Sequence, residues 1–219
     1  MNEYRYEATG IPGFVQQLAV SYLTNGYHQY VACRIPPHKD PVAVDCKLIR
    51  RYDIAVSKWT RARRKKAGLA NLQYLRLGRY FLLLATSGRH RFFEDEAASI
   101  RDVSRGQPIQ FASYSIGYYN GRVSVRLPLM LSQQVRGELL RLALRLDTAS
   151  LDRRFASLPF EPYAPVRRQL YSILRAVNAK RKTAGLEMVD WRCIRSRRRV
   201  VEALLPPQLE SGKVSSEAA

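Results

Sequence analysis

Residues 109–127 read IQFASYSIGYYNGRVSVRL, with Asn120-Gly121 between two strand-like runs. Asn-Gly is the strongest short signal for a β-hairpin, because the favoured two-residue turn needs a positive φ at both positions. The cross-strand pairs that this turn predicts are Tyr118 with Val123, Ile116 with Val125 and Tyr114 with Leu127. We expect these pairs to face the core. Arg122 and Arg126 then lie on the other face beside Tyr119, either as ordinary solvated side chains or as a platform for nucleic acid.

The sequence before the hairpin contains both helical and strand-like segments. Helices are predicted over 12–24, 41–52, 57–67 and 91–103, and a strand over 27–35. Asp40 and Ser57 are predicted N-caps, because their side-chain oxygens can accept from the free backbone N–H groups of a first turn. The run YFLLLA at 80–85 lies between Gly78 and Gly88. Such a short, continuously apolar run is typical of a strand covered on both faces, although its periodicity also fits a buried helix.

After the hairpin the sequence becomes mainly helical. Apolar stripes predict helices over 131–147 and about 165–182. The predicted fold class is therefore α+β, with a small mixed sheet and an Asn-Gly hairpin packed by helices, followed by a mainly helical C-terminal part. The predicted division is a mixed basic domain at 1–128, a helical basic region at 129–205 and a disordered tail at 206–219.

The composition points to a polyanionic partner. The chain has 219 residues and a formal net charge of +19, with 37 Lys and Arg against 18 Asp and Glu. Such an excess attracts anions, so nucleic acid is the expected partner and an anionic membrane the alternative. No apolar run approaches the roughly 20 residues that span a bilayer, and the N-terminus does not resemble a signal peptide. The 3 cysteines are widely spaced, so we expect a cytoplasmic protein without a disulfide framework.

One phrase occurs twice in similar form. Residues 61–69 read RARRKKAGL and residues 178–186 read NAKRKTAGL. In each, a basic helical end precedes Ala-Gly-Leu, where the glycine suits the left-handed residue that closes a helix. Cations at that position also face the negative end of the helix dipole. We expect these clusters to meet on one continuous surface.

The candidate nucleic-acid contacts follow from charge and aromatic interleaving. No acid occurs between Ile54 and Phe93. The candidate phosphate-binding residues are Lys58, Arg61, Arg63, Arg64, Lys65, Lys66, Arg76, Arg79, Arg89, Arg91, Arg122, Arg126, Lys180, Arg181, Lys182, Arg197, Arg198 and Arg199. The candidate stacking residues are Trp59, Tyr74, Tyr119 and Trp191, since bases stack on aromatic faces while cations follow the phosphates. Alternatively, the charges form solvated helix faces and the aromatics belong to the core.

Catalytic motifs are scarce. The sequence has no Cys-x-x-Cys, His-Glu-x-x-His, phosphate-binding loop, dinucleotide fingerprint or Gly-x-Ser-x-Gly. The best catalytic candidates are His90 and Glu94, which share a face if they lie on one helix and could then hold a metal ion. The alternative is that Glu94, Asp95 and Glu96 only open a helix, where the dipole favours negative charge.

Three hypotheses follow from these features. The leading one is a non-enzymatic protein that grips the backbone of RNA or single-stranded DNA, in replication, a mobile element or a ribonucleoprotein, and needs no cofactor. The second is a metal-dependent nuclease or strand-transfer enzyme centred on His90 and Glu94, which would use Mg²⁺ or Mn²⁺. The third is a scaffold subunit whose basic faces bind an acidic protein.

Overall fold

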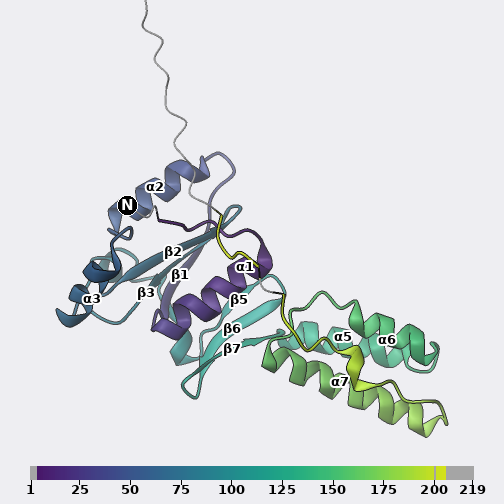
Figure 1. Cartoon of the computed structure of the whole chain (residues 1–219). Helices are drawn as coiled ribbons and strands as arrows, with labels where there is room; N and C mark the ends of the chain where they lie inside the picture. The colour runs from purple at the N-terminus through teal and green to yellow at the C-terminus, as the bar shows by residue number, and fades with distance from the viewer. Residues whose placement is uncertain (1–3, 200, 206–219) are drawn as a thin grey trace, which may run out of the picture.

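The computed structural model describes residues 4–199 and 201–205 of the chain. Its strands form two antiparallel sheets, and a mainly helical part follows them (Figure 1). This arrangement confirms the predicted α+β class with a helical C-terminal part. The disordered tail predicted at 206–219 lies outside the described residues.

The first sheet is buried on both faces. Its strands lie in the order β2 (Leu72–Leu77), β3 (Tyr80–Ala85), β1 (Gln29–Arg34) and β4 (Arg101–Asp102). Side chains alternate along β3, so Leu82 and Leu84 enter one core cluster while Phe81 and Leu83 enter another. The second cluster includes partly buried side chains of α2 (Pro41–Arg51). The prediction of a doubly covered strand at 80–85 is confirmed.

The first helix joins the two sheets. It runs without interruption through α1 (Ile11–Gln16), the π-helical η1 (Gln17–Tyr22) and the short η2 (Leu23–Asn25), as predicted for 12–24. The Phe14 ring lies 5.8 Å from that of Tyr80 on β3 and 4.1 Å from that of Phe111. Because Phe111 belongs to the second sheet, this aromatic contact fixes the helix against both sheets (Figure 1).

The second sheet contains the predicted hairpin. Its strands are β5 (Ile109–Phe111), β6 (Tyr114–Tyr119) and β7 (Arg122–Arg126). Tyr118 pairs with Val123 and Ile116 with Val125, which confirms the register. Asn120 and Gly121 have φ values of 48° and 74°, as the tight turn requires. Ile116 and Val125 are buried, as expected for the core face.

Three α-helices form the C-terminal part: α5 (Leu129–Leu142), α6 (Thr148–Ala156) and α7 (Ala164–Thr183). The Gln169 side chain accepts from the Leu127 N–H at 2.9 Å and donates to the Leu127 carbonyl at 3.0 Å, which ties α7 to the end of the hairpin. One cluster of buried side chains continues from the sheets into these helices, and the boundary at residue 128 stays a prediction. Among the described residues, no helix has both the length and the apolar character needed to cross a bilayer.

The last described residues return to the N-terminal part. After the short η4 (Trp191–Cys193), the chain runs back along the molecule, drawn in yellow in Figure 1. Leu204 forms an antiparallel bridge with Ala8, and the Leu205 N–H donates to the Glu7 carbonyl at 2.8 Å. Residues 201–205 therefore add to the edge of the first sheet rather than to the helical part.

Two segments differ from the sequence-based expectation. The helix predicted over 91–103 is only α4 (Phe92–Asp95), and the chain then turns so that residues 101–102 pair with β1. Phe92 is fully buried against Tyr52, whereas the neighbouring Phe93 is only partly buried. Sheet pairing therefore overrides the helical period. The helix α6 is not among the predicted helices; Asp147 caps it by accepting from the Ser150 N–H at 2.7 Å.

Candidate nucleic-acid interface

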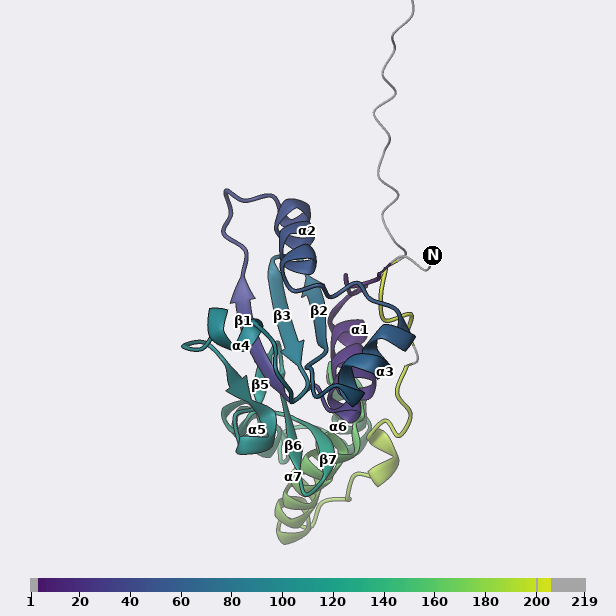
Figure 2. The same cartoon turned by 90° about the vertical axis from the view of Figure 1, so that its left-hand side faces the viewer.

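The basic segment at 58–66 forms α3 (Lys58–Lys66) and ends as predicted. Ser57 caps its first turn by accepting from the Thr60 N–H at 3.1 Å, and Gly68 follows with a φ of 69°. In the part of the chain that the structure describes, no residue of α3 is buried. Figure 2 looks onto the end of the molecule that carries this helix. Apolar burial therefore contributes little to holding α3 in place.

Polar contacts attach α3 to the body of the protein. Arg61 donates to the Ile54 carbonyl at 3.3 Å, and the Asn71 amide donates to the Arg61 carbonyl at 3.0 Å. Arg64 donates to the Asp53 carbonyl at 3.0 Å and forms an ion pair with the Asp53 carboxylate. Arg61 and Arg64, predicted to bind phosphate, thus point inward and anchor the helix. Sequence reasoning missed Asp53, which immediately precedes the acid-free stretch.

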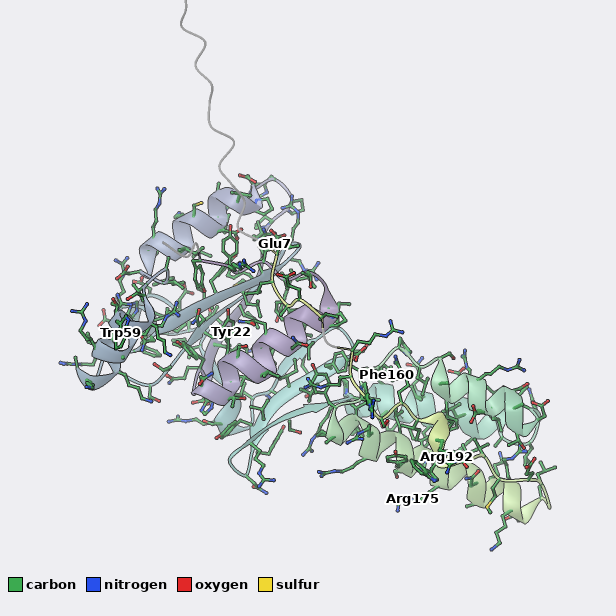
Figure 3. All side chains as sticks on the ribbon, in the orientation of Figure 1. Glu7, Tyr22, Trp59, Phe160, Arg175 and Arg192 are labelled. Carbon is green, nitrogen blue, oxygen red and sulfur yellow. The ribbon has the colours of Figure 1, made fainter. Side chains whose placement is uncertain are left out.

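The outward residues of α3 form what we call the α3 patch: Lys58, Trp59, Arg63, Lys65 and Lys66. Within residues 4–199 and 201–205, no ion pair or hydrogen bond involves the side chains of these cations. The Trp59 side chain is 81% exposed and lies at the outer end of the molecule (Figure 3). Trp59, Arg63 and Lys66 follow a spacing of four and three residues, so they share one face of the helix.

A neighbouring loop brings further positive charge to the end of α3. The Arg89 N–H donates to the Gly68 carbonyl at 3.0 Å, and the Ala70 N–H donates to the Arg89 carbonyl at 3.1 Å. A Cβ on Gly88 would lie 2.6 Å from the Ala70 nitrogen, so this contact requires glycine. The structure thus brings the exposed Arg89 beside the end of α3, whereas the exposed Arg91 lies 3.5 Å from Asp95 of α4.

The candidate catalytic pair, His90 and Glu94, has no third metal-binding side chain beside it among the described residues. His90 Nδ1 accepts from the Phe92 N–H at 3.1 Å, and Glu94 is exposed on the four-residue helix α4. Among the described residues, no group of three or more His, Cys, Asp and Glu side chains is placed to hold a metal ion. The metal-dependent alternative stays a prediction that rests on sequence spacing.

His90 gives a pH-dependent prediction for this region. Burial, followed by the charges of Arg64 and Arg91, lowers the pKa of His90. The unfolded chain therefore takes up this proton first as the pH falls below the ordinary histidine pKa of about 6.5, and the folded state loses stability. We expect His90→Gln to reduce this acid-induced loss. Urea unfolding above and below the ordinary histidine pKa measures the loss of stability. A variant with the same pH dependence as the parent protein would contradict the assignment of this loss to His90.

Two candidates in β2 prove to be structural. Tyr74 is fully buried and donates to the Asp45 carboxylate at 2.6 Å. Arg76 is 5% exposed and contacts Asp45 at 2.8 Å and Glu7 at 2.6 Å. Burial and the Asp45 carboxylate raise the pKa of Tyr74, so its phenol remains a neutral donor. Tyr74 and Arg76 do not belong to the interface, because nucleic acid cannot reach either buried side chain without unfolding β2.

Two further candidates hold backbone carbonyls. Arg181 is 2% exposed and donates to the Ala143 carbonyl at 2.7 Å and the Leu146 carbonyl at 2.8 Å. It thereby closes the end of α5 onto α7 and is not available to phosphate. Arg79 is half-buried and donates to the Pro36 carbonyl at 2.6 Å, which fixes the segment after β1.

The expectation that the clusters meet on one surface is wrong. Lys180 and Lys182 are exposed at the C-terminal end of α7, and α3 lies at the opposite end of the elongated molecule (Figure 1). Trp191 is 59% exposed, and the guanidinium of Arg192 lies 5.8 Å from the centre of its ring. Figure 3 places Arg192 in the helical part, far from Trp59. The two Ala-Gly-Leu phrases therefore close similar helices on separate surfaces.

The remaining candidates form smaller exposed groups. Arg197, Arg198 and Arg199 are exposed in the segment after η4, where the Arg198 guanidinium lies 4.8 Å from the centre of the Tyr163 ring.

On the outer face of the hairpin, the Arg126 guanidinium lies 4.7 Å from the centre of the Tyr119 ring. The Tyr119 ring lies over Gly117, where a Cβ would come within 2.8 Å of a ring carbon. Tyr119 is 39% exposed and Arg122 is exposed beside it, as predicted for this face. Because Arg126 already covers part of the Tyr119 ring, this face offers less open aromatic surface than Trp59 does.

No protein-family model, curated protein or solved structure matches this chain. The candidate interface therefore rests on the geometry of the chain itself.

Proposed function

We propose that this protein binds single-stranded nucleic acid, RNA or single-stranded DNA, through the α3 patch. The observation that carries the proposal is the 81% exposed Trp59 on a helix whose outward cations make no ion pair among the described residues. An exposed basic helix without an aromatic ring would suit any polyanion. The indole adds a flat apolar surface on which an unpaired base stacks.

Each component of the patch has a distinct role in this proposal. Arg63, Lys65 and Lys66 bind phosphates, and Arg89 extends the positive charge beyond the end of the helix. Trp59 stacks on one base, and this preference for unpaired bases favours a single strand over a duplex. Because Arg61 and Arg64 hold α3 in position before binding, little conformational entropy is lost when the strand binds.

Removing the cations tests the electrostatic part of the proposal. We expect the combined variant Arg63→Ala, Lys65→Ala and Lys66→Ala to weaken binding and to flatten its salt dependence. The slope of log K against log salt concentration should become shallower by about 2, because each phosphate contact to a single strand contributes about 0.7. Filter binding of a labelled single-stranded oligonucleotide over a range of salt concentrations measures this slope.

The matched control lies at the other end of the molecule. The combined variant Arg175→Ala, Lys180→Ala and Lys182→Ala removes one arginine and two lysines from exposed positions of α7, so its net charge is identical. We expect its slope to stay close to that of the parent protein. An equal decrease of affinity and of salt slope in both variants would show that binding follows the overall charge, and would reject the α3 patch as the site. Tight binding to an acidic protein that the oligonucleotide cannot displace would favour the scaffold hypothesis instead.

A further inference from the structure

A cavity of about 980 Å³ lies at the base of α3, and no residue pattern in the sequence indicated it. It is formed by the N-terminal end of α3, the helix α1–η1 and the segment at residues 4–5. Its polar lining includes Tyr4, Gln17, Tyr22, Lys58, Arg61 and Gln73. Figure 3 shows Trp59 and Tyr22 in the same part of the molecule. The volume of the cavity lies within the roughly 300–1,000 Å³ typical of small-molecule sites.

Arg61 presents unused hydrogen-bonding capacity inside this cavity. One terminal nitrogen donates to the Ile54 carbonyl at 3.3 Å, while the buried Nε has no partner among the described residues. Burial raises the pKa of Tyr4 and Tyr22, and the charge of Arg61 acts in the opposite direction on both. Arg61, Tyr4 and Tyr22 line the same cavity. The other terminal nitrogen makes no hydrogen bond to the described residues, so it can donate to an acceptor of a ligand.

The polar groups of the cavity floor are held in fixed positions. The Tyr4 hydroxyl donates to Gln73 Oε1 at 2.9 Å and accepts from the Tyr74 N–H at 2.8 Å. The Gln73 amide nitrogen lies 3.4 Å from the Tyr27 hydroxyl. Gln17 lines the cavity, and its Oε1 accepts from the Ser21 hydroxyl at 3.2 Å. Amides and phenols in such fixed positions can read the edge of a base.

The charge of the lining selects an anionic ligand. Arg5, Lys58 and Arg61 line the cavity, and among the described lining residues none is acidic. Arg5 is partly neutralised by Glu202 at 3.3 Å, whereas Lys58 and Arg61 form no ion pair within the described chain. Two cations beside two aromatic rings and two amides match a phosphate joined to a base.

We propose that this cavity binds one nucleotide of the strand held by the α3 patch. Its phosphate contacts Arg61 and Lys58, and its base lies against Tyr4 and Tyr22 within reach of Gln17 and Gln73. The inference rests on the proposed function, because Lys58 belongs to both the patch and the cavity. It adds a site that distinguishes one nucleotide of the strand from the others, which backbone contacts alone cannot do.

Free mononucleotides test this site separately from strand binding. Isothermal titration calorimetry is carried out with the nucleoside 5′-monophosphates, and with inorganic phosphate and uncharged nucleosides as comparison ligands. We expect at least one mononucleotide to bind with one site per chain and more tightly than either comparison ligand. Equal binding of phosphate alone would overturn the assignment of a base site.

Two variants locate the binding. We expect Arg61→Gln to weaken mononucleotide binding about tenfold, which corresponds to about 1.4 kcal/mol. Ala55 is exposed at the cavity lining, so Ala55→Trp should fill the cavity and abolish binding while keeping every cation. Ala179→Trp on α7 is the matched control and should bind normally. A thermal melt shows whether each variant folds, and Ala55→Trp keeps the test decisive if Arg61→Gln does not.

The outcomes separate the two proposals. Failure of every mononucleotide to bind, or binding that both variants leave unchanged, would overturn the cavity site. Oligonucleotide binding that persists in Ala55→Trp but still requires Trp59 would keep the strand-binding function. Mononucleotide binding that the variants remove, in a protein that binds no oligonucleotide, would support the cavity and reject the strand-binding function.

Discussion

Replacing Arg76 with alanine is expected to lower the free energy of unfolding by about 3–5 kcal/mol, because it leaves a buried carboxylate without its partner. Asp45 is 0% exposed and contacts Arg76 at 2.8 Å, and Glu7 contacts the same guanidinium at 2.6 Å. Arg76 thereby ties α2 and the N-terminal segment to β2. Urea unfolding followed by circular dichroism measures the loss.

The control for this variant is an exposed arginine nearby. Arg50 lies exposed on α2, so Arg50→Ala should change the free energy of unfolding by no more than about 0.5 kcal/mol. An Arg76→Ala variant as stable as Arg50→Ala would contradict the structural role. We also expect the folded fraction of Arg76→Ala to bind oligonucleotides as the parent protein does, since Arg76 does not reach the α3 patch.

Replacing Trp59 with alanine is expected to give the largest functional loss. Stacking of one base on an aromatic ring contributes about 1–3 kcal/mol, so the affinity for a single strand should fall by roughly 5- to 150-fold. Because Trp59 is 81% exposed, the stability of the protein should change little. Fluorescence anisotropy of a labelled oligonucleotide measures the affinity.

Trp191→Ala is the matched control for stacking. Trp191 is 59% exposed but lies in the helical part of the molecule, so its removal should leave the affinity close to that of the parent protein. A duplex of the same sequence should lose less affinity than the single strand in Trp59→Ala, because its bases are already stacked. A loss in Trp191→Ala equal to that in Trp59→Ala would place the strand elsewhere.

Local chemistry made several parts of the fold predictable. Asn120-Gly121 predicted both the turn and the register of the hairpin, because a two-residue loop allows few alternatives. The caps at Asp40 and Ser57 predicted where two helices begin. The exposed cations and Trp59 of α3 were predicted from a stretch without acids, where no neighbour in sequence could pair with them.

Other features depend on contacts between distant residues. Arginine is usually found at the protein surface, so the sequence around Arg76 does not indicate that it is buried. Its buried partner Asp45 is 31 positions away. Arg181 likewise binds carbonyls 38 and 35 positions away. The helix expected at 91–103 is limited to α4, because residues 101–102 pair with β1. The separation of the two Ala-Gly-Leu phrases follows from the path of the chain through both sheets, which no local pattern encodes.

The two tryptophans allow the most direct test of the central claim, because Trp59 lies on α3 and Trp191 lies in η4 of the helical part. Trp191→Phe leaves Trp59 as the fluorophore in α3, and Trp59→Phe leaves Trp191. Titration with a single-stranded oligonucleotide should quench Trp59 emission and saturate at the concentration that binding requires, while Trp191 emission stays constant. Quenching of Trp191 with no change at Trp59 would contradict the assignment of α3 as the binding surface.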